Sequence, residues 1–461
     1  MAEPARDVGS SDSLEEQIEQ WRSYLRRRQA IRPVDVEELE DHLRGEVTAL
    51  RGTGLSENEA FLVAVKRMGA LDAISNEFAR EHSERLWKQL VISSTTTAES
   101  ADKARTETVV VFALAVAAGL AIKVPELFGR KWGAAADEMF YARNISLFVF
   151  PLLTGYFIWK RRISARNWLW LALAFAVAVL FANVYPFQGR SDTEVLTALH
   201  LPIALWLPVG IAYAGGRWRE TAGRMDFVRF SGELLIYYAL IALGGGVLLG
   251  LTAGMFGAIG IDFEPVFEDW LPCAILGAVI VASWLVEAKQ SVIENMAPVL
   301  TRIFTPLFAI ALIAFLGTMI GTGRGIDIER QALIVFDLVL VLVLGLLLYS
   351  ISARDPEAPP GAFDRVLVLL LVSALVADAF ALAAIGNRIS EFGFTPNRVA
   401  ALGENVILLG NLGWSTMLYL KFLRGRGSLA DLERWHTAYL PVYFVWAGLV
   451  VVAFPPLFGF D

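Results

Sequence analysis

The pattern of hydrophobic and polar positions changes near residue 107. Before this point, apolar residues recur at helical spacing among charged ones. After it, apolar runs follow one another, each close to the roughly 18 or more residues needed to cross about 30 Å of hydrocarbon. The pattern therefore predicts an all-α fold, in which a small soluble four-helix domain precedes a polytopic membrane helix bundle.

The second part of the chain contains about eleven runs with the length of a transmembrane helix. We expect these spans at residues 107–122, 144–159, 167–184, 195–214, 231–256, 270–286, 303–321, 331–351, 365–386, 398–420 and 438–456. Their number is odd, which predicts that the two ends of the membrane domain lie on opposite sides of the bilayer.

Small residues and prolines predict how these spans pack. Gly246, Gly250 and Gly254 repeat every four residues in the fifth span, and Gly317 and Gly321 do so in the seventh. This spacing lets helix backbones approach closely. Prolines lie within or at the edge of spans at positions 151, 202, 208, 306 and 441. They predict kinked or discontinuous helices near a cavity, because proline frees backbone carbonyls.

The first part of the chain is predicted to divide into a disordered N-terminus (1–12), a helical domain (13–92) and a polar linker (93–106), followed by the membrane domain (107–461). Three helix starts carry a capping residue followed three positions later by glutamate. These pairs are Ser13 and Glu16, Asp35 and Glu38, and Ser56 and Glu59. Apolar stripes follow each cap, and Leu71, Ile74 and Phe78 begin a fourth helix.

Composition supports this division and excludes several chemistries. The chain is 56% hydrophobic with a net charge of −7, and residues 1–107 hold 21 acidic and 15 basic side chains. Cys273 is the only cysteine, and the four histidines show no pair at ligand spacing. We therefore expect no disulfide, no metal site and no cofactor. The acidic balance predicts no nucleic-acid partner, and the chain has no Gly-rich Lys-Ser/Thr loop for ATP.

Charges in the predicted loops indicate an orientation. Alternate loops hold 16 basic residues: Lys160, Arg161, Arg162, Arg166, Arg217, Arg219, Arg224, Arg229, Lys289, Arg302, Arg354, Arg365, Lys421, Arg424, Arg426 and Arg434. The opposite loops hold about half as many basic residues. In one of them, residues 262–269, all the charged residues are acidic. By the positive-inside rule, the N-terminus is cytoplasmic and the C-terminus external.

Ionisable residues inside the spans are the candidates for a functional site, because charge is costly in a bilayer. At about 1.5 Å per residue, Asp337, Asp378 and the pair Glu404 and Asn405 each lie roughly 10 Å below the external end of a span. His200 lies within about two turns of that end. The charged residues Arg143, Arg388, Glu391 and Arg398 lie at the same boundary.

These nine residues admit two interpretations. In the functional one, they form a polar cavity open to the external side that binds a polar solute or relays protons. In the structural one, ion pairs and helix caps lock the helices together, and this is the favoured interpretation of the group as a whole. Both interpretations stay open for Asp337 and Asp378, which lie deeper and have no evident local cation. A lone histidine such as His200 is more often a packing residue.

The two parts of the chain each resemble a known family. EELEDHLRGEVTALRGTGLSENEAF and VKRMGALDAISNEFA, within residues 13–90, resemble the bacterial permease prefix domain. The resemblance implies a cytoplasmic interaction or regulatory module. Four segments of the membrane domain resemble the bacterial membrane family called domain of unknown function 4153. They are GNRISEFGFTPNRVAALGENVILL (386–409), FVRFSGELLIYYALIALGGG (227–246), YARNISLFVFPLL (141–153) and YLPVYFVWAGLVVVAFPPLFGF (439–460). This second resemblance implies a multi-helix inner-membrane protein and transfers no catalytic residue.

Three functions are consistent with these features. The favoured one is a transporter-like or solute-binding membrane protein regulated through residues 13–92, with the lipid bilayer and a cytoplasmic protein as partners. The alternative is a membrane sensor or scaffold that signals through this helical domain. The third is a membrane-embedded enzyme that acts on a lipid-linked substrate through Arg388, Glu391, Arg398 and His200. It lacks a nucleophile–base motif, and an enzymatic activity is not the expectation.

Overall fold

The computed structural model describes residues 14–15, 18, 33–52, 54–67, 97–187, 189–262, 264–288, 296–321, 330–354 and 358–461. All regular structure in these residues is helical. The chain divides into two compact units, Met1–Lys103 and Ala104–Asp461. The boundary lies close to the predicted end of the linker, although residues 97–106 belong to the first long helix instead of forming a separate connection.

The first unit contains helices α2 (Pro33–Arg51) and α3 (Glu57–Arg67). Leu43, Val47, Ala60, Phe61, Ala64 and Ile18 are buried together in its core. At the start of α3, the predicted capping pair is present: Glu59 accepts hydrogen bonds from the backbone N–H of Ser56 at 3.1 Å and from its hydroxyl group at 2.7 Å. At α2, the helix begins at Pro33, so Asp35 lies inside the first turn instead of capping it. Most of the predicted first helix and all of the fourth lie outside the described residues.

Among the described residues, eleven long helices lie wholly or mostly in the second unit. Their bounds are α6 (Thr97–Ala121), α7 (Glu138–Arg161), α8 (Ala165–Val184), α9 (Asp192–Ala214), α10 (Thr221–Ala258), α11 (Glu264–Ala288), α13 (Met296–Gly321), α14 (Arg330–Ser352), α15 (Ala362–Phe392), α16 (Pro396–Leu423) and α17 (Leu429–Leu457). A short 3-10 helix, η1 (Val124–Phe128), follows α6.

Ten of these helices are long and apolar enough to cross a membrane. The exception is α7, although it contains the predicted span 144–159. Charged Arg143 and Lys160 bound its apolar stretch, which also holds Asn144, Gly155 and Tyr156, three residues of low hydropathy. All eleven predicted spans are therefore helical, and ten of them have the composition of membrane spans among the described residues.

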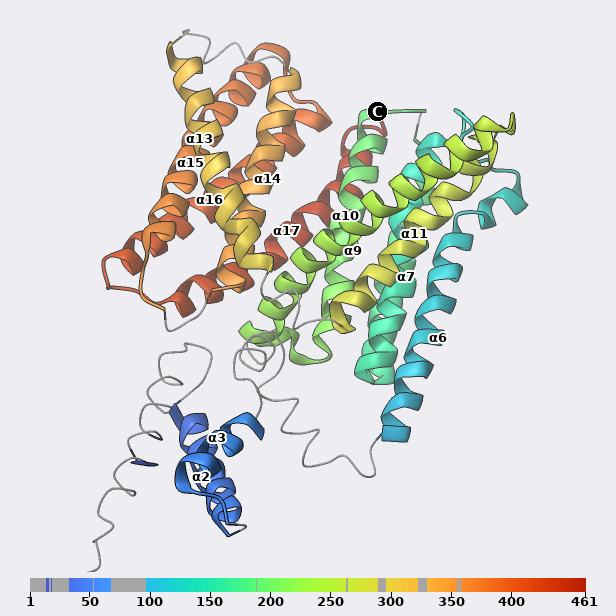
Figure 1. Cartoon of the computed structure of the whole chain (residues 1–461). Helices are drawn as coiled ribbons and strands as arrows, with labels where there is room; N and C mark the ends of the chain where they lie inside the picture. The colour runs from blue at the N-terminus through green and yellow to red at the C-terminus, as the bar shows by residue number, and fades with distance from the viewer. Residues whose placement is uncertain are drawn as a thin grey trace, which may run out of the picture. The chain divides into compact units, whose positions relative to one another are not determined.

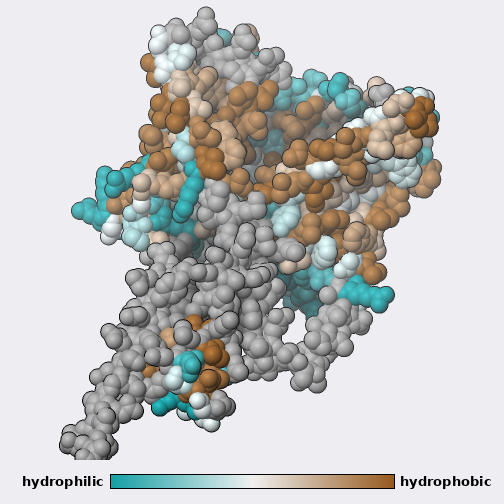
Figure 2. Space-filling view, viewed as in Figure 1, coloured by the Kyte–Doolittle hydropathy of each residue, from teal (hydrophilic) through white to brown (hydrophobic). Residues whose placement is uncertain are grey.

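Helix α17 lies between two groups of helices within this unit. It packs against α9 and α10 on one side and against α16 and α14 on the other (Figure 1). Helix α15 packs against α16, α13 and α14, and α7 packs against α9. Apolar side chains cover the outer faces of the helices in the view of Figure 2, as expected for surfaces that contact hydrocarbon.

The predicted glycine packing is wrong for the described residues. A Cβ atom added at Gly246, Gly250 or Gly254 would meet nothing within 4 Å, and the same holds at Gly317 and Gly321. Close approach occurs at other glycines. A Cβ atom at Gly119 of α6 would lie 2.6 Å from the carbonyl oxygen of Cys273 in α11, and one at Gly403 of α16 would overlap the Trp446 ring of α17.

The expectation of discontinuous helices is also wrong for the described spans. Pro151, Pro202, Pro208, Pro306 and Pro441 all lie inside helices that continue past them. Neighbouring helices that cover the freed carbonyl groups are the general reason why a membrane helix tolerates proline.

Candidate functional site

Four helices bring five of the predicted residues into one polar cluster. His200 comes from α9, Asp337 from α14, Asp378 from α15, and Glu404 and Asn405 from α16. We call this set the carboxylate cluster. Neighbouring helices of the set are in direct contact, with α16 packed against α9, α14 and α15.

At one end of the cluster, Glu404 binds His200. The His200 Nε2 atom lies 2.6 Å from Glu404 Oε1, and its Nδ1 atom lies 2.8 Å from the carbonyl oxygen of Leu196. The carbonyl can only accept a hydrogen bond, so Nδ1 carries a proton. His200 is buried, whereas the Glu404 side chain is 33% exposed. Glu404 is therefore the part of the cluster that is open to the surroundings.

In the middle of the cluster, Asn405 binds Asp337. Its Nδ2 atom donates to Asp337 Oδ1 at 2.7 Å and to the carbonyl oxygen of Ala401 at 2.8 Å. Both N–H bonds of the amide are thus used, while its Oδ1 atom is buried and has no partner among the residues that the structure describes. Asp337 also lies close enough to Glu404 for the two carboxyl groups to interact electrostatically.

Asp378 lies deepest. Its exposure is 0%, and neither of its carboxyl oxygens has a hydrogen-bond partner among the described residues. Asp337 is near enough to interact with it electrostatically. Ionised carboxylates and amide oxygens only accept hydrogen bonds. Three buried acceptor atoms, two from Asp378 and one from Asn405, therefore lack a donor, and a proton on Asp378 would supply one.

The four remaining predicted residues make no hydrogen bond or ion pair to the carboxylate cluster in the described part of the chain. Arg143 pairs with Glu194 of α9 and lies over the Phe187 ring. Arg398 donates to the carbonyl oxygens of Phe392 and Gly393, and so closes the turn between α15 and α16. Glu391 accepts a hydrogen bond from Asn387, and Arg388 makes no ion pair among the described residues. None of the three arginines neutralises the carboxylate cluster in the described part of the chain.

A second polar network, between α16 and α17, was not predicted. Ser415 Oγ lies 3.1 Å from His436 Nε2 and donates to Asn411, whose side chain also binds Trp435 at 3.1 Å and Tyr443 at 2.5 Å. A prediction based on charged residues cannot find this network, because most of its members are neutral polar side chains. Asn411 and Ser415, one helical turn apart in an apolar run, were the signal that could have found it.

Ion pairs join helix ends at the basic loops. Lys160 lies 2.8 Å from Glu107 of α6 and 3.2 Å from Glu287 of α11, and Arg161 lies 3.0 Å from Glu287. The beginning of the candidate span Arg105–Phe128 and the ends of α7 and α11 therefore lie together, as expected for helices that alternate in direction.

Comparisons of this chain with known protein families, with curated proteins and with solved structures give no match. The class of the protein therefore follows from its own structure: its many apolar helices are those of a multi-pass membrane protein. The two family resemblances noted in the sequence remain predictions.

Proposed function

We propose that this chain is a transporter-like, multi-pass protein of the bacterial inner membrane that binds a polar solute, and that Asp337 and Asp378 bind and release protons as it does so. The observation that carries the proposal is Asp378, which lies fully buried beside Asp337 and has no hydrogen-bond donor in the described part of the chain.

Electrostatics favours a proton on this pair. An ionised aspartate near the centre of a membrane helix costs about 2.5–3.5 kcal/mol on insertion scales. A second negative charge nearby adds to that cost, because like charges interact more strongly where the dielectric constant is low. A neutral Asp378 avoids both terms and can donate a hydrogen bond to a neighbouring acceptor.

The exposure of the three carboxyl groups supports a route for protons. Glu404 is partly exposed, Asp337 is half-buried, and Asp378 is fully buried. His200 binds Glu404 directly, so a second titratable group lies at the exposed end. Chains of Asp, Glu and His side chains form proton relays in membrane pumps and transporters.

The proposed orientation has the N-terminus in the cytoplasm and the C-terminus outside. The excess of basic residues in alternate loops supports it. The ion pairs of Lys160 and Arg161, which join three helix ends, support the alternation of the helices. In this orientation residues 13–92 are a cytoplasmic domain that regulates the membrane unit or binds a protein partner, as the resemblance to the permease prefix domain implies.

A sensor or scaffold is the second candidate function. The division of the chain at Lys103 and Ala104 favours it, because the first unit has a core of its own. The geometry does not favour an enzyme that acts through His200 and Arg398. His200 binds Glu404, whereas Arg398 binds backbone carbonyl groups, so the two side chains have different partners.

The test uses the full-length protein in liposomes that enclose a pH-sensitive dye. Polar solutes are added outside one at a time, and the internal pH is recorded. We expect at least one solute to change the internal pH with the wild-type protein. Asp378→Asn and Asp337→Asn should abolish that change, because an amide cannot take up a proton.

Asp192→Asn is the matched control, since Asp192 is an exposed carboxylate in the first turn of α9, outside the cluster. It should behave as the wild type does. A solute that still moves protons through both cluster variants, or a panel in which no solute changes the internal pH, would contradict the proposal. Loss of the pH change only when residues 1–92 are deleted would favour the sensor.

A further inference from the structure

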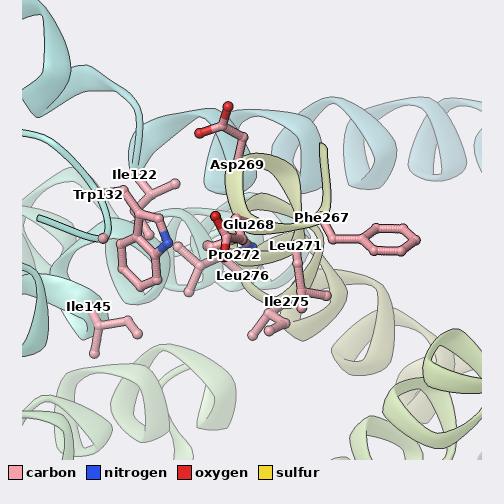
Figure 3. A pocket seen from close by; sticks show the side chains of 11 residues that line it. Ile122, Trp132, Ile145, Phe267, Glu268, Asp269, Leu271, Pro272, Ile275 and Leu276 are labelled. Atoms are coloured by element: carbon pink, nitrogen blue, oxygen red, sulfur yellow. The ribbon is translucent and has the colours of Figure 1, made fainter. Parts of the chain in front are cut away.

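A cavity of about 680 Å³ lies away from the carboxylate cluster, where α6, α7, α11 and the segment after η1 meet (Figure 3). Its walls are mostly apolar. They include Ile122, Trp132, Ile145, Glu268, Ile275 and Leu276. Sites for organic ligands typically have volumes of about 300–1,000 Å³, apolar walls and a few polar groups.

The polar part of this cavity suits a cation. The Glu268 carboxyl group lies toward the Trp132 indole ring, whereas Asp269 and Phe267 are directed away from the centre (Figure 3). Glu268 makes no ion pair among the described residues, while Asp269 lies 3.5 Å from Lys123. An aromatic ring and a carboxylate together recognise an ammonium group, the ring through its quadrupole and the carboxylate through its charge.

The apolar part of the cavity suits a hydrocarbon chain. Ile122 and Leu276 form a buried surface, while Ile145 and Ile275 are open to the outside of the helix bundle. The cavity thus joins a polar end near Glu268 to an apolar face of α7 and α11. A ligand with an ammonium group at one end and a hydrocarbon at the other fits both parts.

We propose that this cavity binds a phospholipid of the bilayer with an ammonium headgroup, such as phosphatidylethanolamine. Glu268 and Trp132 bind the ammonium group, and the acyl chain lies along Ile145, Ile275 and Leu276. Lys131, which is exposed and next to Trp132, is a partner for the phosphate. The proposal is independent of the solute bound at the carboxylate cluster.

The place of the cavity favours a bilayer lipid over a soluble amine. It lies at the end of the candidate span Arg105–Phe128 and the beginning of Phe267–Ala288, where a membrane has its headgroups. Leu127 and Phe128 of η1 are both 82% exposed beside it. Exposed apolar and aromatic residues at the end of a span are typical of the membrane interface.

The test is a titration of delipidated full-length protein in detergent with short-chain phosphatidylethanolamine or phosphatidylglycerol, in which native mass spectrometry counts the bound lipid. We expect the ammonium lipid to bind about tenfold more tightly. Glu268→Gln and Trp132→Leu should each remove most of that preference, because each removes one of the two groups that recognise the cation. Trp132→Phe should keep part of it, since the aromatic face remains.

Two control variants match the substitutions outside the cavity. Asp192→Asn removes an exposed carboxylate at another helix end, and Trp170→Leu removes an exposed tryptophan of α8. Both should bind as the wild type does. Equal affinity for the two lipids, or wild-type preference in Glu268→Gln and Trp132→Leu, would overturn the proposal. Displacement of the lipid by water-soluble tetraethylammonium would show a site for free organic cations and overturn the lipid assignment.

Discussion

Asp137 shows how a single carboxylate can organise a connecting segment. It accepts hydrogen bonds from the backbone N–H of Lys131 at 2.8 Å and from the Arg130 guanidinium at 2.9 Å. These groups bind the ionised form, so they hold the pKa of Asp137 below its usual value of 3.8. A lowered pKa means that the contribution to stability is present above pH 3.8 and is lost as the pH falls through the lowered value.

At neutral pH we therefore expect Asp137→Asn to loosen the segment between η1 and α7. Trypsin should cleave this variant after Arg130 or Lys131 several-fold faster than the wild type, because a neutral amide binds both donors more weakly. Glu138→Gln is the matched control, since the neighbouring carboxylate pairs with Arg190 instead. Equal cleavage rates in Asp137→Asn and Glu138→Gln would contradict this role of Asp137.

The sequence predicts the depth of the carboxylates in the membrane but not the side chains that they bind. Spans that alternate in direction bring side chains of equal depth together. This predicts one group that includes Asp337, Asp378, Glu404, Asn405 and His200, and the structure brings these five into one cluster. Depth alone could not show the rotation of each helix about its axis. Arg143 and Arg398 therefore belonged to the predicted group, although Arg143 binds Glu194 and Arg398 binds carbonyl groups.

At the scale of whole helices, the apolar pattern predicted which residues are helical but not which faces meet. Gly250 and Gly403 both lie in apolar runs, yet only the second lies against another helix. Helix formation depends on local sequence and the apolar solvent, whereas packing depends on contacts between helices far apart in the chain. The glycine pattern of α10 therefore could not distinguish a packed face from an exposed one.

The difference between a packed and an exposed glycine can be tested by replacing each with alanine. Gly403→Ala should destabilise the protein by about 1–3 kcal/mol, because the added methyl group would overlap the Trp446 ring in a packed interface. Gly254→Ala should be neutral or stabilise by up to about 1 kcal/mol, since alanine is the better helix former and space is available. Melting temperatures in detergent measure both. Comparable melting temperatures for the two variants would show that α16 and α17 are not packed in this way.

For the whole molecule, the proposed orientation predicts the side of the membrane on which each loop lies. In a Cys273→Ser background, Ala135→Cys should react in intact cells with a maleimide that cannot cross the membrane. Ser164→Cys lies in a basic connection between α7 and α8 and should react only after the membrane is permeabilised. Each site is exposed in the structure, so access and not burial decides the outcome. The reverse pattern of labelling would invert the proposed orientation.

We propose that Asp378, buried in the helix bundle beside Asp337, is a neutral, protonated carboxyl group at neutral pH. Infrared spectroscopy of the full-length protein in lipid tests it most directly, because the carbonyl band of a protonated carboxylic acid is separate from the bands of carboxylates. We expect such a band at neutral pH, its loss in Asp378→Asn and its persistence in Asp192→Asn. A wild-type spectrum without this band, or a band that Asp378→Asn leaves unchanged, would show that Asp378 is not protonated.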